Sequence, residues 1–315
     1  MATKRRRAES WDDSPTSPVR SDIWFEDGNI IVQAEDTQFR VYKGPLCKSS
    51  EVLKTAVDNM GDSKGVDGCP LLFLSDSPTD LGHVFRALFD PWSNPDSVPL
   101  PFEVVAAFLR LGRKYDMKPM YSRALARVTS VFPTSVEEFT ACVPTKLFVF
   151  ADPPNAQRLE IVVDTILLAR ELTLPSLLPS ALWYASVNLE AFANRRATSL
   201  SEIDRQGIIL GGNGARSAYA EYLFDWLDES AVPSPNCIAP KSCCARKMKY
   251  SLKLWRPPGS KVRLSWHASA EKGLCTPCIT LGKKHHSEGR KRFWKELPSF
   301  FNLPSWDELL ALAVE

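Results

Sequence analysis

The sequence predicts an α/β (α+β) protein, with a small sheet and helical hairpins in its first part, a mainly helical middle and a small cysteine-containing C-terminal region. Three observations lead to this fold class. Short runs of apolar residues that are typical of strands lie before residue 45 and near residue 72. Apolar residues recur at helical spacing through most of the remaining chain, and glycine and proline separate these segments.

Composition indicates an intracellular globular protein of about two domains, since the chain has 315 residues, 44% of them hydrophobic and 24% charged. No apolar run of about 18 residues is present, and the N-terminus has no apolar signal core, so we expect neither a membrane span nor secretion. The eight cysteines are expected to be reduced, in the nucleus or the cytoplasm. Lys4-Arg5-Arg6-Arg7 has the composition of a nuclear-import signal, although such runs also occur by chance.

Charge divides the chain unequally. Residues 1–236 carry 24 basic and 31 acidic side chains (net −7), whereas residues 237–315 carry 15 basic and 6 acidic ones (net +9). Together with the spacing patterns, this predicts four parts. They are a disordered basic, Ser/Pro-bearing terminus (1–20), a globular domain (21–132), a helical extension (133–236) and a basic, Cys/Trp-containing C-terminal region (237–315).

The segment 21–43 predicts a short antiparallel meander. Asp27-Gly28-Asn29 is a hairpin-type turn signal, and apolar residues alternate on both sides of Glu35-Asp36-Thr37. Gly44-Pro45 then begins a short helix, and Ser49 is the expected cap of the next one. One apolar stripe at helical spacing follows, made of Leu53, Ala56, Val57 and Met60.

Residues 70–132 predict a buried strand followed by three helices. The run "PLLFL" is continuous and apolar, and Ser77-Pro78 is a helix-start signal directly after it. Two further apolar stripes cover 104–115 and 117–128, and Pro133 ends the last helix.

Beyond residue 133 the pattern is mainly helical, with helices expected over 159–167, 182–192 and 219–227. The glycine-rich stretch "GIILGGNGARSAY" lacks the Lys-Ser/Thr of a phosphate loop, so it predicts a turn that joins two helices. Near the end, Ser305 and Glu308 predict a capping box for a short final helix.

The order and residues of the first domain resemble the BTB/POZ family over roughly residues 21–132. The resemblance rests on "DIWF", "FRVYKGPLCKSSEVLKTAV", "CPLLFLSDSPTDLGHVFRALFD" and "VVAAFLRLGRKYDMKPMYSRALARV", and it is closest to the expanded fungal BTB proteins. The tail "HHSEGRKRFWKELPSFFNLPSWDEL" is similar to the C-terminal region of those proteins. One departure is Tyr42, because the family usually has histidine at that position.

The resemblance implies a non-enzymatic protein-interaction adaptor that pairs as a homodimer and recruits a cullin-type ubiquitin ligase scaffold or a corepressor. It implies Asp22, Lys43, Leu46 and Leu53 as residues of the dimer or partner groove, with Asp22 and Lys43 matching a charged pair found there in some members. The alternative for these two residues is an ordinary solvent-exposed pair.

Cys275-Thr276-Pro277-Cys278 is the sharpest local motif. Its spacing lets two thiolates bind one tetrahedral zinc ion, with Cys244 and His285 as the expected remaining ligands. Cys237, Cys243 and His286 are further candidates, and of the adjacent cysteines 243 and 244 only one can easily join the same site. Plain buried or surface thiols without a cofactor are the leading interpretation of these cysteines, and the zinc site and a redox pair are the alternatives.

The basic C-terminal region offers a second function from a different class. Its lysines and arginines are interleaved with Trp255 and Trp266, a composition that suits phosphates and unpaired bases. The alternative is that the tryptophans pack inside the protein and the charges face water, and this weighs against nucleic acid as a partner. A zinc-containing nucleic-acid-binding protein is therefore the alternative to the adaptor.

Overall fold

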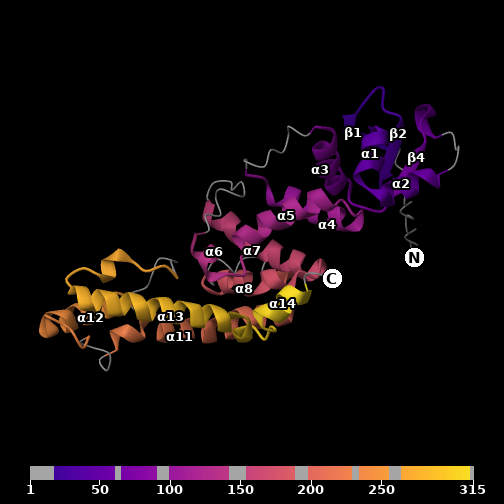
Figure 1. The fold of residues 1–315 in the computed structure, drawn as a ribbon. Coiled ribbons are helices and arrows are strands. Elements are labelled where there is room, and N and C mark those ends of the chain that lie inside the picture. Colours follow the sequence, from indigo (N-terminus) through magenta and orange to yellow (C-terminus); the bar gives the residue numbers. More distant parts are fainter. Residues whose placement is uncertain are drawn as a thin grey trace, which may run out of the picture. The chain divides into compact units, whose positions relative to one another are not determined.

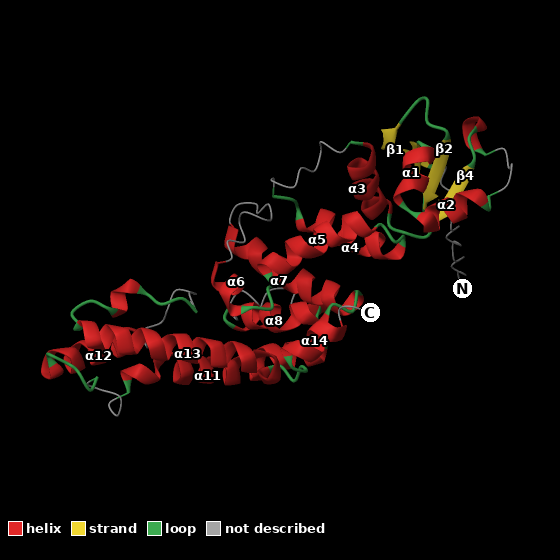
Figure 2. Ribbon diagram, in the orientation of Figure 1, coloured by secondary structure: helices red, strands yellow, loops and turns green. Residues whose placement is uncertain are grey.

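A computed structural model describes residues 18–60, 65–90, 99–141, 154–188, 198–228, 234–254 and 264–312. The basic motif Lys4-Arg5-Arg6-Arg7 and Trp255 lie outside these residues. The chain forms two compact units, one of residues 1–95 and 107–121 and the other of 96–106 and 122–315. The expected helical extension and C-terminal region both fall in the second unit. The protein is a mixed α/β chain, mostly helical, and the described strands all lie in the first unit (Figure 2).

The sheet of the first unit has four strands in the order β1-β3-β2-β4. Strands β1, β2 and β4 are labelled in Figure 1. They are β1 (Val19–Trp24), β2 (Ile30–Ala34), β3 (Thr37–Val41) and β4 (Leu71–Leu74). As predicted, β2 and β3 are antiparallel, but β1 is parallel to β3 and β4 is parallel to β2. The full antiparallel meander was therefore wrong. The turn at Asp27-Gly28-Asn29 connects β1 to β2, but these two strands are not neighbours in the sheet. The Asn29 N–H donates to the Val41 carbonyl of β3, the strand that lies between them.

Helices α1 (Lys43–Ser49), α2 (Glu51–Asp58) and α3 (Pro78–Phe89) each add buried residues to this unit's core, and η1 (Val66–Gly68) is a short turn before β4. The cap of α2 is Ser50 rather than Ser49. The Ser50 hydroxyl accepts the Leu53 N–H at 3.0 Å and donates to the Tyr115 carbonyl at 2.5 Å. This buried side chain thus fixes the start of α2 and links it to a residue far along the chain.

Helices α4 (Phe102–Lys114) and α5 (Lys118–Val131) each contribute residues to both units. The second unit is otherwise built of helical segments. They are α6 (Val136–Ala141), α7 (Pro154–Glu171), η4 (Pro175–Leu177), α8 (Leu178–Ser186), α10 (Glu202–Gln206), η6 (Gly207–Gly211), α11 (Gly212–Phe224), η7 (Asp225–Leu227), α12 (Pro240–Leu254), η9 (Ala268–Ala270), α13 (Thr276–Phe300) and α14 (Trp306–Leu312).

The glycine-rich stretch does not form the predicted turn. Segments α10, η6 and α11 follow one another as helix, with η6 as a π-helical turn. The glycines serve packing, because a Cβ on Gly212 would lie 2.4 Å from the Ser186 side chain. On the facing helix, a Cβ on Gly289 would lie 1.8 Å from the Tyr222 carbonyl oxygen. The missing side chain at Gly212 therefore lets α11 approach α8, and the one at Gly289 lets α11 and α13 run closely side by side (Figure 1).

The C-terminal helix α14 has the predicted capping box, since the Ser305 hydroxyl bonds to the Glu308 carboxylate at 2.7 Å and accepts the Glu308 N–H at 3.4 Å. Its first residue packs on α13. The Trp306 and Trp294 rings stack with centroids 5.5 Å apart and planes 12° apart, and Trp306 Nε1–H donates to the Trp294 carbonyl at 2.7 Å. Among the helices of the described segments, none has the length and apolar character needed to span a membrane.

Candidate metal centre

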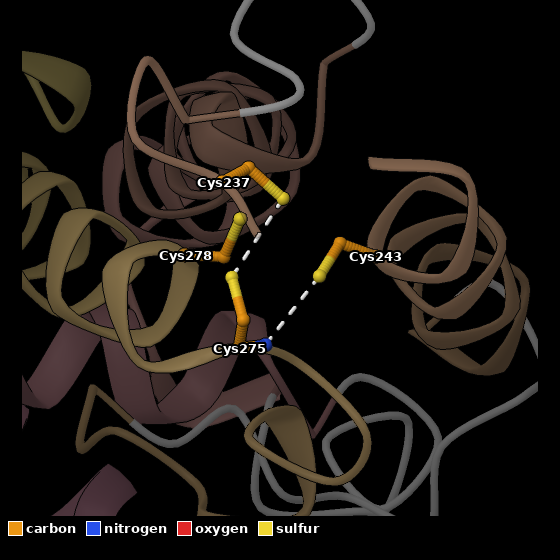
Figure 3. Close-up of side chains that lie close together, drawn as sticks. All are labelled: Cys237, Cys243, Cys275 and Cys278. Atoms are coloured by element: carbon orange, nitrogen blue, oxygen red, sulfur yellow. Dashed lines mark hydrogen bonds between the residues drawn. The ribbon is translucent and has the colours of Figure 1, made fainter. Parts of the chain in front are cut away.

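Four cysteines of the second unit lie together, and they come from three separate pieces of chain (Figure 3). Cys275 is the N-cap of α13 and Cys278 lies in its first turn, so the CxxC spacing directs both sulfurs to one side. Cys243 lies in the first turn of α12. Cys237 belongs to the turn before α12, which is closed by a bond from the Cys237 N–H to the Ser234 carbonyl at 2.8 Å.

The sulfur atoms have a separation that suits a tetrahedral metal ion. All four Sγ atoms lie within 4.8 Å of one another, and those of Cys275 and Cys237 are 3.7 Å apart. A tetrahedron with Zn–S bonds of about 2.3 Å has S–S edges of about 3.8 Å. The Cys275 N–H also donates to the Cys243 sulfur at 3.4 Å, which fixes the entry of α13 against α12. These four cysteines can therefore hold a metal ion.

The thiols differ in how easily they lose a proton. The backbone N–H of Cys278 hydrogen-bonds the sulfur of Cys275 and lowers the pKa of Cys275 to about 6. Burial raises the pKa of Cys278 to about 12 and also raises that of Cys243. A bound divalent cation favours deprotonated thiolates, so metal binding would release protons from the buried cysteines.

The structure brings together Cys275 and Cys278 from the predicted ligands, but not Cys244 or His285. Cys244 follows Cys243 on α12, and the rotation of about 100° per helical residue turns it away from the cluster. The His285 ring Nδ1 lies 3.3 Å from the Asp225 carboxylate. The positions that replace them in the cluster are 237 and 243.

His286, another candidate, is a core histidine. It is buried and its ring lies edge-on to Trp266, with centroids 5.4 Å apart. Trp266 in turn packs on Trp226 at 5.1 Å, so this tryptophan of the basic region faces the interior. A sequence signal could have found Cys243: it shares a stripe at spacings of four and seven with Lys247 and Tyr250, which also face inward.

Two of the predicted groove residues of the first unit lie in exposed ion pairs, and the other two lie in its core. Asp22 pairs with Arg86, and the Lys43 ammonium lies 3.9 Å from the Asp58 carboxylate, in exposed surroundings. Asp22 and Lys43 therefore have separate partners. Leu46 and Leu53 are 0% and 1% exposed and belong to the core of their own chain.

Comparison with protein-family models, with curated proteins and with solved structures finds no match to this chain. The BTB/POZ assignment thus stays a prediction from the sequence.

Proposed function

We propose that this chain is a protein-interaction adaptor without catalytic activity, and that a structural zinc ion holds its C-terminal region together. The observation that carries the zinc half is the closed set of four thiols, Cys237, Cys243, Cys275 and Cys278. Soft thiolate ligands in a tetrahedral arrangement suit Zn²⁺. Catalytic zinc keeps an open position for water or substrate, whereas four protein ligands leave none.

Such an ion would join three separate pieces of chain. It would bind the turn before α12, α12 itself and the N-terminus of α13. Structural zinc contributes directly to folding free energy, because the ligands are not preassembled in the unfolded chain. The expected role of the metal is therefore structural: it would stabilise the folded C-terminal region.

The first experiment is the metal content of the purified full-length protein, measured by inductively coupled plasma mass spectrometry. We expect about one zinc per chain in the wild type, loss of zinc in Cys243→Ser and retention in Cys244→Ser. The two cysteines are adjacent on one helix, so the second variant is a matched control. A wild-type protein without zinc, or equal zinc content in both variants, would contradict the site.

The adaptor half rests on the edges of the sheet as well as on the family resemblance. Strands β1 and β4 are the two edges, and each carries an exposed apolar side chain: Val19 is 60% exposed and Phe73 is 67% exposed. An edge strand offers unpaired backbone groups to which a partner can add a strand. The partners that fit the resemblance are a second copy of the chain, a cullin-type scaffold or a corepressor.

Self-association is tested by native mass spectrometry of the full-length protein across micromolar concentrations. We expect a dimer for the wild type and for Leu310→Ser, a control that removes an exposed apolar side chain from α14. We expect a monomer for Phe73→Ser. A wild-type monomer at every concentration would contradict self-pairing.

Nucleic-acid binding is a second candidate function, favoured by one observation. The outer side of α12 exposes Lys241, Arg246 and Lys249, and the sequence has no acidic residue between Ser230 and Ala270. Fluorescence anisotropy with labelled single-stranded and duplex DNA at low salt tests it. Binding that weakens steeply with salt would support this function, and an unchanged signal would eliminate it.

A further inference from the structure

A buried lysine lies one helical turn from one of the four cysteines. Lys247 is only 3% exposed, although lysine is almost never buried without a partner. It sits one helical turn after Cys243 on α12, so the two side chains leave the helix on the same face. In the described segments, no carboxylate forms an ion pair with its ammonium group.

The direct neighbours of this ammonium group are a carbonyl and an aromatic ring. The Lys247 Nζ donates to the Trp226 backbone carbonyl at 2.9 Å and lies 5.6 Å from the centre of the Trp226 ring. An ammonium group has three N–H donors, so the carbonyl accounts for one of them. Burial lowers the pKa of Lys247, while the nearby thiols of Cys278, Cys244 and Cys243 raise it.

Charge balance connects these facts with the metal centre. A Zn²⁺ ion (+2) with four thiolates (−4) has a net charge of −2, in a site where Cys243 and Cys278 are fully buried. A buried charge without compensation is strongly unfavourable. The negative charge of the buried metal–thiolate centre and the positive charge of the buried ammonium group would compensate each other.

We propose that Lys247 is the counter-charge of the metal centre, and that its ammonium group, held by the Trp226 carbonyl, strengthens metal binding and lowers the reactivity of the sulfurs. This inference rests on the proposed zinc site. Lys247 acts here as a positioning residue, because it would bind no metal itself. Groups of this kind around metal ligands typically change metal affinity by about 10- to 100-fold when they are replaced.

The test uses the full-length protein and three variants. Lys247→Met removes the charge and keeps an apolar chain of similar length, and Lys247→Gln removes the charge but keeps an N–H donor for the carbonyl. Lys249→Met is the matched control, since it removes the same charge from an exposed position on the same helix. Zinc affinity is measured by competition with a chromophoric chelator, and sulfur reactivity by the rate of zinc release with N-ethylmaleimide.

We expect both Lys247 variants to bind zinc about 10- to 100-fold more weakly and to release it faster, and Lys249→Met to match the wild type. Co²⁺ in place of zinc gives a readout that loss of packing would not produce. The thiolate-to-cobalt charge-transfer band should move to lower energy in both Lys247 variants, while the ligand-field bands keep their tetrahedral form.

Wild-type affinity and an unmoved charge-transfer band in Lys247→Gln would overturn the inference, because a hydrogen bond to the carbonyl would then suffice. Wild-type affinity in both Lys247 variants would overturn it as well. These results leave the zinc site intact. A wild-type protein that takes up neither Zn²⁺ nor Co²⁺ would instead overturn the zinc site, and the role of Lys247 with it.

Discussion

Replacing Gly289 with alanine should disrupt the close packing of α13 on α11. The added Cβ would lie 1.8 Å from the Tyr222 carbonyl oxygen, so the two helices must separate by about 1.6 Å to reach ordinary contact at 3.4 Å. The nearest atoms belong to the backbone, which cannot rotate away. We expect overpacking to cost about 3 kcal/mol, offset by about 1 kcal/mol of better helix propensity. The net loss of unfolding free energy is about 2 kcal/mol.

A control of opposite sign exists in the same unit. Gly207 has helical backbone angles (φ −55°, ψ −48°), and a Cβ there would meet no atom within 4 Å. Gly207→Ala should therefore raise the unfolding free energy by up to about 1 kcal/mol.

Urea denaturation of each full-length variant, followed by tryptophan fluorescence and by far-ultraviolet circular dichroism, measures both effects. A Gly289→Ala protein as stable as the wild type would refute the close approach of α11 and α13. An equal loss of unfolding free energy in Gly207→Ala would show that replacing glycine, rather than the steric clash of the new Cβ, lowers the stability. That result would refute this reasoning.

Three further predictions concern the second unit. Removing the metal with a chelator should lower the melting temperature by about 10 °C, if free zinc is about 1,000 times its dissociation constant, as followed by differential scanning fluorimetry. Burial lowers the pKa of His286 to about 4, so its imidazole binds a proton more readily in the unfolded chain than in the folded one. The free energy of unfolding should therefore fall by up to about 2 kcal/mol as pH drops from about 6.5 to 4. For His286→Leu, denaturation across this range should show a weaker dependence of stability on pH. Asp204 is 3% exposed and accepts bonds from Arg170 at 2.7 Å and from Ser201 at 2.8 Å. Asp204→Ala should cost about 2 kcal/mol in urea denaturation, and a cost no larger than that of the exposed Glu202→Ala would contradict the buried pair.

Local patterns predicted the elements that local residues determine. Alternation from Ile30 to Val41 gave the β2–β3 hairpin, and Ser305 with Glu308 gave the cap of α14. Strand β1 was predicted to be antiparallel to its neighbour, but it pairs with β3 in parallel. This pairing depends on the path of the chain after the turn, which the residue pattern within β1 does not indicate.

The same distinction explains the metal centre. Cys275 and Cys278 are three residues apart and form a recognisable pair, whereas Cys237 and Cys243 reach the site only when α12 lies against α13. The choice between positions 243 and 244 depends on helix rotation, which a pair of adjacent cysteines does not reveal. Likewise, the sequence around Gly212 favours a turn. Only the structure shows that glycine is needed there because Ser186, distant in sequence, packs against it.

The stacked indoles of Trp294 and Trp306 give the protein an optical property of its own. The two rings are close enough for their electronic transitions to couple, so we expect the pair to contribute a circular dichroism signal separate from that of the helices. That signal requires α14 to remain on α13. The end of the described chain therefore carries a spectroscopic marker of its own attachment, which needs no added label.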